Sequence, residues 1–168
     1  MPTIKIVQDV LAPEYQKVTK LSGYHPSQLL KIIPDTLLNV FRQQTPALFE
    51  DELKWDTSDD PVMFFSKWRL RDGKDRRTKV VVSVIVEGYQ SKQDLSGKVT
   101  VALRCQILTE INYQTVIDRS LYWLYDRFFY KRHRMEYIEE ARRRMIELED
   151  KIKAYFGTLE RVKTREVT

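Results

Sequence analysis

Hydrophobic positions change their period twice along this chain, and the changes separate three kinds of element. Between residues 48 and 108 apolar side chains recur at every second position, most regularly at Val80, Val82, Val84 and Val86. A period of two is typical of strands that bury one face. The connections in this region are short and polar, and short connections favour antiparallel neighbours. We therefore predict an antiparallel meander of four strands.

The residues before this meander combine one strand with helical spacing. The stretch from Thr3 to Leu11 alternates and predicts a first strand. Apolar residues then follow at spacings of three and four, and Pro13, Pro26 and Pro34 each suit the first turn of a helix. Because proline lacks a backbone donor and disfavours a helical residue before it, Pro34 also predicts an interruption. We expect two or three short helices over residues 13–43.

A stretch without glycine or proline, from Asp118 to Phe156, predicts one long C-terminal helix that ends at Gly157. Its first half carries a broad apolar stripe, and its second half carries a narrower, heptad-like seam. An unbroken helix over 118–156 would be about 58 Å long, whereas a compact domain of this size is roughly 40 Å across. We therefore expect the first half to cover the sheet and the second half to project.

Together these elements predict an α+β fold: an antiparallel meander covered by a long C-terminal helix, with short helices between the first and second strands. We assign residues 1–157 to a single domain and residues 158–168 to a charged, flexible tail. This order of elements resembles the START-like, or helix-grip, superfamily over roughly residues 3–156. The resemblance is topological, and it implies a curved sheet around the C-terminal helix with an apolar cavity between them.

The resemblance implies a non-enzymatic domain that binds an apolar or lipid-like small molecule between sheet and helix. Such a molecule needs a preformed apolar pocket with few polar groups, and we expect no cofactor and no metal. The expected lining residues are Phe64, Trp68, Val82, Val84, Leu103, Leu124 and Phe128. No catalytic motif is recognisable, since neither His25 nor His133 has a serine or cysteine at motif-like spacing. An enzyme of the cyclase or hydratase kind stays open as an alternative.

A second hypothesis assigns the chain to interaction or assembly through the second half of the long helix, residues 138–155. A protein partner or a second copy would bind its apolar seam, at Ile138, Met145, Leu148 and Ile152.

A third hypothesis is association with anions or nucleic acid through two basic groups. These comprise Arg71, Lys74, Arg76, Arg77, Lys131, Arg132 and Arg134. Asp72 and Asp75 interrupt the first group, and no aromatic platform of an RNA-binding motif is recognisable. We therefore rank this hypothesis behind the others.

Composition narrows these hypotheses. With 42% hydrophobic and 32% charged residues the chain belongs with folded globular proteins. A net charge of +5 favours anionic surfaces only mildly. The single cysteine, Cys105, excludes an internal disulfide, and its apolar alternation predicts a buried thiol. The sequence has no run of about 18 apolar residues and no secretion signal, so we expect a cytoplasmic protein.

Overall fold

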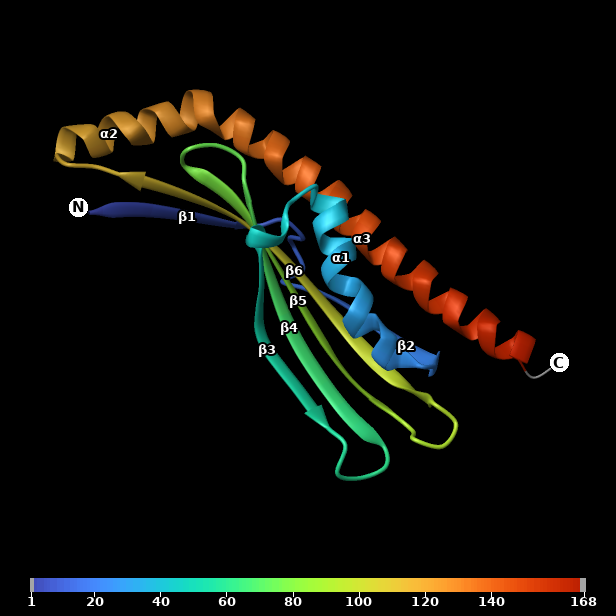
Figure 1. The fold of residues 1–168 in the computed structure, drawn as a ribbon. Helices are drawn as coiled ribbons and strands as arrows, with labels where there is room; N and C mark the ends of the chain where they lie inside the picture. Colours follow the sequence, from blue (N-terminus) through green and yellow to red (C-terminus); the bar gives the residue numbers. More distant parts are fainter. Residues whose placement is uncertain (1, 167–168) are drawn as a thin grey trace.

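The computed structural model describes the backbone of residues 2–166 and the side chains of residues 2–159 and 161. Six strands form one antiparallel sheet (Figure 1), in the order β1-β6-β5-β4-β3 with β2 also paired to β6. The strands are β1 (Thr3–Asp9), β2 (Lys17–Tyr24), β3 (Leu48–Asp56), β4 (Val62–Gly73), β5 (Thr78–Gln90) and β6 (Ser96–Asn112). The predicted α+β class, with its antiparallel meander and long C-terminal helix, is confirmed.

Strands β1 and β2 form two segments of the same sheet edge. Strand β6 is 17 residues long, and it places Gln106 opposite Asp9 of β1 and Leu103 opposite Lys17 of β2. The helix expected after Pro13 is therefore wrong. The apolar spacing there suits a helix, but pairing as a strand satisfies backbone groups along β6 that would otherwise lie at an open edge.

Helix α1 (Leu29–Phe41) follows a short 3-10 turn (Pro26–Gln28) and contains Pro34 in its interior. The predicted interruption at this proline is wrong. Leu29, Ile33 and Leu37 recur every four residues and are fully buried. Burial of each such side chain contributes about 1.5–3 kcal/mol, so the stripe outweighs the roughly 3 kcal/mol that proline costs inside a helix.

The C-terminal part of the chain is one helical rod in three segments: α2 (Val116–Tyr125), the π-helical segment η3 (Asp126–Tyr130) and α3 (Lys131–Glu166). The rod bends near η3 (Figure 1), as π-helical insertions commonly cause. It starts at Thr115, whose side chain and that of Asp118 each accept the other's backbone N–H at 3.1 Å, forming a capping box.

The rod continues through Gly157, so the predicted helix end is wrong. Leu159 packs against the core, and the helix runs to Glu166 in place of the flexible tail expected from residue 158. The last two residues of that expected tail, 167 and 168, lie outside the described residues.

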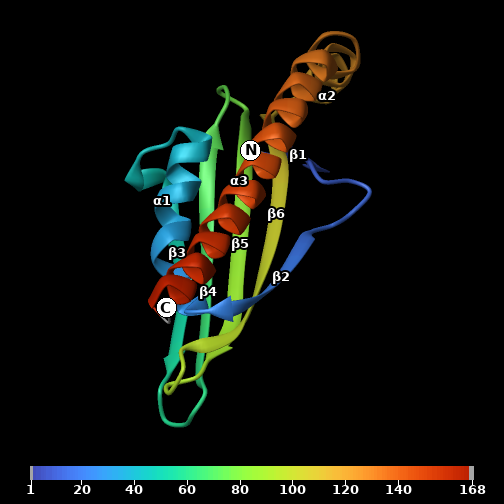
Figure 2. The same ribbon diagram turned by 90° about the vertical axis from the view of Figure 1, so that its right-hand side faces the viewer.

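Helices α1 and α3 lie side by side on one face of the sheet (Figure 2). The narrow seam of α3 is buried there: Ile138, Ala141, Met145, Leu148, Ile152 and Phe156. By contrast, α2 contains no buried residue; it lies above β1 and the end of β6 in Figure 1 without packing closely on them. The expected roles of the two halves are therefore reversed. The narrow seam contacts α1 on one side and strands β2 and β6 on the other, whereas the broad stripe meets no comparable surface.

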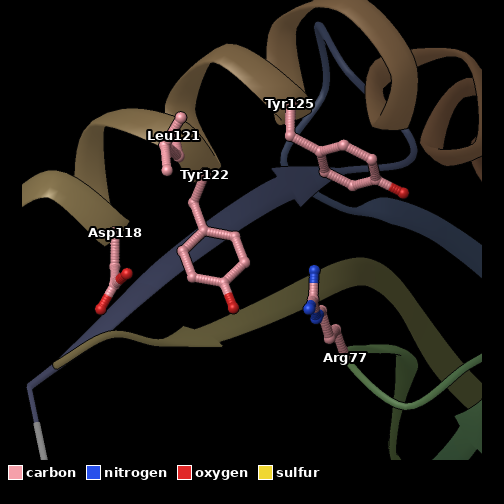
Figure 3. A pocket seen from close by; sticks show the side chains of 5 residues that line it. All are labelled: Arg77, Asp118, Leu121, Tyr122 and Tyr125. Atoms are coloured by element: carbon pink, nitrogen blue, oxygen red, sulfur yellow. The ribbon is translucent and has the colours of Figure 1, made fainter.

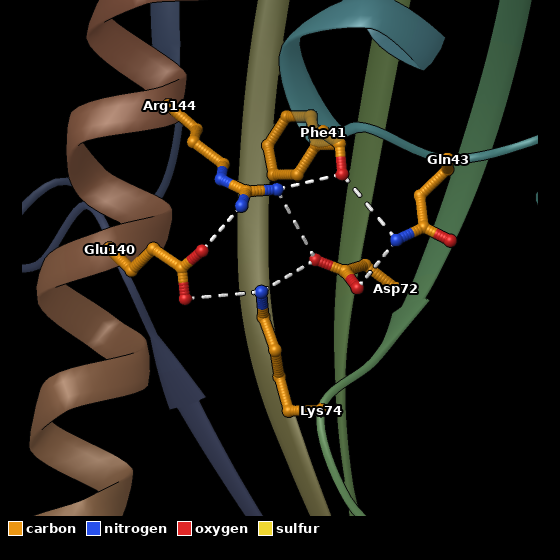
Figure 4. Close-up of polar contacts among 6 residues, drawn as sticks. All are labelled: Phe41, Gln43, Asp72, Lys74, Glu140 and Arg144. Atoms are coloured by element: carbon orange, nitrogen blue, oxygen red, sulfur yellow. Dashed lines mark hydrogen bonds and ion pairs between the residues drawn. The ribbon is translucent and has the colours of Figure 1, made fainter.

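A buried group of charges ties three elements together (Figure 4). Asp72, at the end of β4, lies 2.9 Å from the Nζ of Lys74 and accepts a 2.8 Å hydrogen bond from Gln43. Lys74 also pairs with Glu140 of α3 at 3.2 Å. Arg144 of α3 pairs with Glu140 and donates to the last carbonyl of α1 at 2.7 Å. Each charge in this group has an opposite charge beside it, as buried ions require.

Candidate interaction surface on the projecting helix

Residues 116–135, which comprise α2, η3 and the first turn of α3, form the part of the rod that lies above β1, the end of β6 and the β4–β5 hairpin (Figure 1). We call this segment the arm. Within residues 116–130 four side chains at intervals of four are partly shielded, at Asp118, Tyr122, Asp126 and Tyr130. This polar stripe faces the domain. It continues to the buried Arg134, whose guanidinium donates to both carboxylate oxygens of Asp126, at 2.6 and 3.2 Å.

Tyr130 fixes the base of the arm to the hairpin between β4 and β5. Its hydroxyl donates to Asp75 at 2.6 Å and contacts the hydroxyl of Thr78. Asp75 in turn accepts backbone N–H groups from Arg77 at 2.7 Å and Thr78 at 2.8 Å. Burial and the bond to Asp75 raise the pKa of Tyr130 to about 12, so its hydroxyl stays a donor throughout the physiological range. The hairpin therefore has a defined position beneath the arm.

Most of the remaining surface of the arm is apolar and open to solvent. Seven large apolar side chains are 50–79% exposed there: Val116, Ile117, Leu121, Trp123, Leu124, Phe128 and Phe129. We call these residues the outer face. Single exposed apolar residues are ordinary, but a contiguous group marks a binding surface. An amphipathic helix of a globular protein normally turns its apolar stripe toward the core, and this one turns it away.

The outer face contains a shallow groove with a volume of about 480 Å³. It is lined by Val116, Ile117, Ser120, Leu121, Trp123 and Leu124. Apolar side chains therefore surround a concave strip along α2.

Positive charge surrounds the outer face. Residues 116–135 include five arginines and lysines but only two aspartates, and both aspartates are engaged, in the capping box and with Arg134. Among the described residues no carboxylate lies within 4.0 Å of the side-chain nitrogens of Arg119, Arg127 or Lys131. Arg127 instead lies over the ring of Trp123, 5.4 Å from its centre. The surface thus combines aromatic side chains with uncompensated cations.

A second hollow, of about 360 Å³, lies between the arm and the β4–β5 hairpin (Figure 3). Its lining residues are Arg77, Asp118, Leu121, Tyr122 and Tyr125. The guanidinium of Arg77 lies 5.0 Å from the centre of the Tyr122 ring. Leu121 also lines the groove of the outer face, so the two concavities adjoin.

The structure divides the residues that were expected to line an internal cavity. Phe64, Trp68, Val82, Val84 and Leu103 are at most 3% exposed and pack with α1 and α3 in one core. Leu124 and Phe128 are instead 50% and 68% exposed, on the outer face of the arm. Their assignment to the same cavity is wrong, because the segment that carries them stands off the sheet and leaves both side chains open to solvent.

The expected partner-binding residues are also placed differently. Ile138, Met145, Leu148 and Ile152 belong to the core, where they are at most 7% exposed. They offer no surface to a partner, because the sheet and α1 already cover them. The interaction hypothesis can hold only if another part of the rod carries it.

The seven basic residues do not form one surface. Lys74 and Arg134 are shielded and paired with carboxylates. Arg71 lies over Phe49 on the other face of the sheet, 5.1 Å from the ring centre. The remaining four lie on the hairpin or the arm: Arg76, Arg77, Lys131 and Arg132. The seven residues therefore lie in separate places, and anion binding by those that are exposed stays a prediction.

Comparisons of the chain with protein-family models, curated proteins and solved structures find no match. Within the described residues no helix is both long enough and apolar enough to cross a membrane. The same residues contain no group of three or more His, Cys, Asp or Glu side chains that could hold a metal ion. Cys105 is buried as predicted, and burial raises the pKa of its thiol to about 12.

Proposed function

We propose that this protein is a non-enzymatic docking domain that attaches to anionic lipid surfaces through the arm. The observation that carries the proposal is the orientation of the arm: its polar stripe faces the domain and its apolar face is turned outward. Helices α1 and α3 pack together on the sheet in one core. Attachment of this kind needs no catalytic residue and no cofactor.

The chemistry of the outer face suits a membrane interface. Helices that lie in the interface present Trp, Phe and Leu to the lipid and carry Arg and Lys beside them, and aromatic rings favour the level of the head groups. Insertion of Leu124 and Phe128 would contribute about 1.5–3 kcal/mol each. Each cation near an anionic surface adds about 1 kcal/mol. These contributions together support reversible attachment.

Charge favours a lipid surface over a second copy as the occupant. Two arms packed face to face would bring Arg119, Arg127 and Lys131 of both copies together without carboxylates to pair with them. Juxtaposed like charges oppose association. An anionic lipid surface supplies the missing negative charge and the apolar layer at once.

This proposal places the site for an apolar ligand on the arm, and not in the interior between sheet and helix. An interior site would require space among core side chains that pack against one another. The outer face offers apolar area without such rearrangement.

Flotation with lipid vesicles tests the proposal. We expect the protein to float with vesicles that contain phosphatidylglycerol, and not with vesicles of phosphatidylcholine alone. Attachment should weaken as salt screens the cations. The double substitution L124D/F128D should abolish it, because two carboxylates cannot enter the apolar layer. The control is I146D. Ile146 is 50% exposed, as Leu124 is, and belongs to the same rod but lies outside the arm.

Two outcomes would contradict this function. One is a wild-type protein that stays in the aqueous phase with anionic vesicles at low salt. The other is a dimer, measured by light scattering after gel filtration, that L124D/F128D converts to monomer. The second result would assign the outer face to another copy of the chain.

A further inference from the structure

We infer that the hollow beside Arg77 binds the phosphate of an anionic phospholipid whose chains lie along the outer groove. This inference rests on the proposed function and adds a specific head-group site to it. The hollow and the groove adjoin at Leu121, which lines both. A concavity that contains an arginine, beside an apolar one, matches the two ends of an amphiphile.

Arg77 supplies the anion-binding group. Its guanidinium stacks near Tyr122 and has no carboxylate within 4.0 Å among the described residues. The planar fork of arginine binds two phosphate oxygens at once, and stacking on an aromatic ring orients it. Figure 3 shows the guanidinium on the same side of α2 as the rings of Tyr122 and Tyr125, whose phenol groups can add hydrogen bonds.

The backbone of Arg77 is held in place without a ligand. Its N–H donates to Asp75 at 2.7 Å, and its carbonyl accepts from the backbone of Glu110 at 2.9 Å. Asp75 is bound in turn by Tyr130 of the arm. The backbone of Arg77 and the arm therefore keep their relative positions, and a site formed in advance loses less entropy when it binds.

Asp118 sets a preference among phosphates. Its carboxylate lines the other end of the hollow, where it caps α2. A second negative charge in the hollow would be repelled by it. We therefore expect a phosphodiester, with one negative charge, to bind better than a phosphomonoester.

Binding of a water-soluble short-chain lipid tests this site apart from membrane attachment. We would titrate dihexanoyl phosphatidylglycerol, below its micelle concentration, into ¹⁵N-labelled protein and follow the amide signals of the hairpin and arm. R77Q should weaken binding at least about tenfold, as the loss of charged hydrogen bonds predicts. R77K should fall between R77Q and wild type. The control is R76Q, because Arg76 is its exposed neighbour and does not line the hollow.

Each outcome bears on the inference. Equal affinity of wild type and R77Q, with R77Q folded by circular dichroism, overturns the site. Equal binding of glycerol 3-phosphate and the lipid overturns the lipid assignment and leaves a site for free phosphate esters. A third outcome is that L124D/F128D abolishes vesicle attachment, whereas R77Q changes neither vesicle attachment nor binding of the short-chain lipid. This outcome removes the subsite and leaves the proposed function intact. Binding of the short-chain lipid without vesicle attachment supports the subsite and removes the proposed function.

Discussion

The hydroxyl of Tyr130 connects the arm to the domain through one carboxylate. Burial alone would raise the pKa of Asp75, but hydrogen bonds from Tyr130 and two backbone N–H groups lower it overall. Burial is the main cause of the raised pKa of Tyr130, and the hydrogen bond to Asp75 raises this pKa further. The pair is thus most stable as a carboxylate beside a neutral phenol.

This pairing predicts that the effect of Y130F on the free energy of unfolding depends on pH. An unfolded chain ionises tyrosine near pH 10, and folded Tyr130 ionises only near 12. Between these values the unfolded state binds fewer protons, so wild-type stability falls as pH rises. At neutral pH Y130F should lower the free energy of unfolding by about 1 kcal/mol. That difference should shrink at pH 11.5, measured by urea denaturation.

Tyr125 provides the control for this experiment, because its hydroxyl has no bond to Asp75. Y125F should change the free energy of unfolding similarly at both pH values. Parallel pH profiles for wild type and Y130F would contradict the pairing.

Asp72 is the second residue whose neighbours predict a large effect. Its carboxylate is buried and faces Lys74 and Arg144, which are themselves largely shielded. Removal of one partner from a buried group of ions costs about 3–5 kcal/mol, because the remaining charges lose their compensation. We expect D72A to lower the free energy of unfolding by that amount in chemical denaturation.

The matched control for Asp72 is D51A. Asp51 also pairs with an arginine, Arg69 at 2.9 Å, but both side chains are partly exposed to solvent. Such pairs contribute at most about 1 kcal/mol. Similar losses in D51A and D72A would refute the structural role assigned to the buried group.

At the scale of elements, Gly157 distinguishes two descriptions of the C-terminal helix. If the helix ended there, with glycine in the left-handed conformation, alanine would destabilise it. In the structure the helix continues, and a Cβ at Gly157 meets no atom within 4 Å. G157A should therefore raise the free energy of unfolding by up to about 1 kcal/mol, since glycine is a poor helix former. A lower melting temperature for G157A would show that the helix ends at this residue.

The strands of the meander were predictable because alternation and burial agree along them. Val80, Val82, Val84 and Val86 predict the buried face of β5, and all four are fully buried. Strand β2 was not predictable from its own residues. Lys17 to Tyr24 has a spacing that a helix also satisfies, and its state depends on backbone groups of β6 that lie far away in the sequence.

The arm was only partly predictable. The sequence shows a long helix with two apolar stripes, and a stripe alone does not reveal which partner covers it. The polar residues carried a usable signal that the first interpretation missed. Asp118, Tyr122, Asp126 and Tyr130 recur every four residues and continue at Arg134. Such a stripe, opposite exposed aromatic residues, indicates which side of the helix faces its own domain.

At the scale of the whole molecule, the rod has two functions at its two ends. Residues from Ile138 onward complete the core between α1 and the sheet. The arm lies above β1 and the end of β6 and contributes no residue to that core among its first fifteen. Stability and the proposed docking are therefore separable along one continuous helix.

Two leucines of the rod make this separation measurable. Leu148 is fully buried and Leu124 is 50% exposed. L148A should lower the free energy of unfolding by about 2–5 kcal/mol, because it removes buried contacts and leaves a cavity. L124A should change it by no more than about 0.5 kcal/mol, yet it should weaken flotation with anionic vesicles. Urea denaturation and flotation of both variants, at a temperature where L148A stays folded, would measure the two effects. A large loss of stability in L124A would mean that the arm is part of the core, and the docking proposal would then lose its free apolar face.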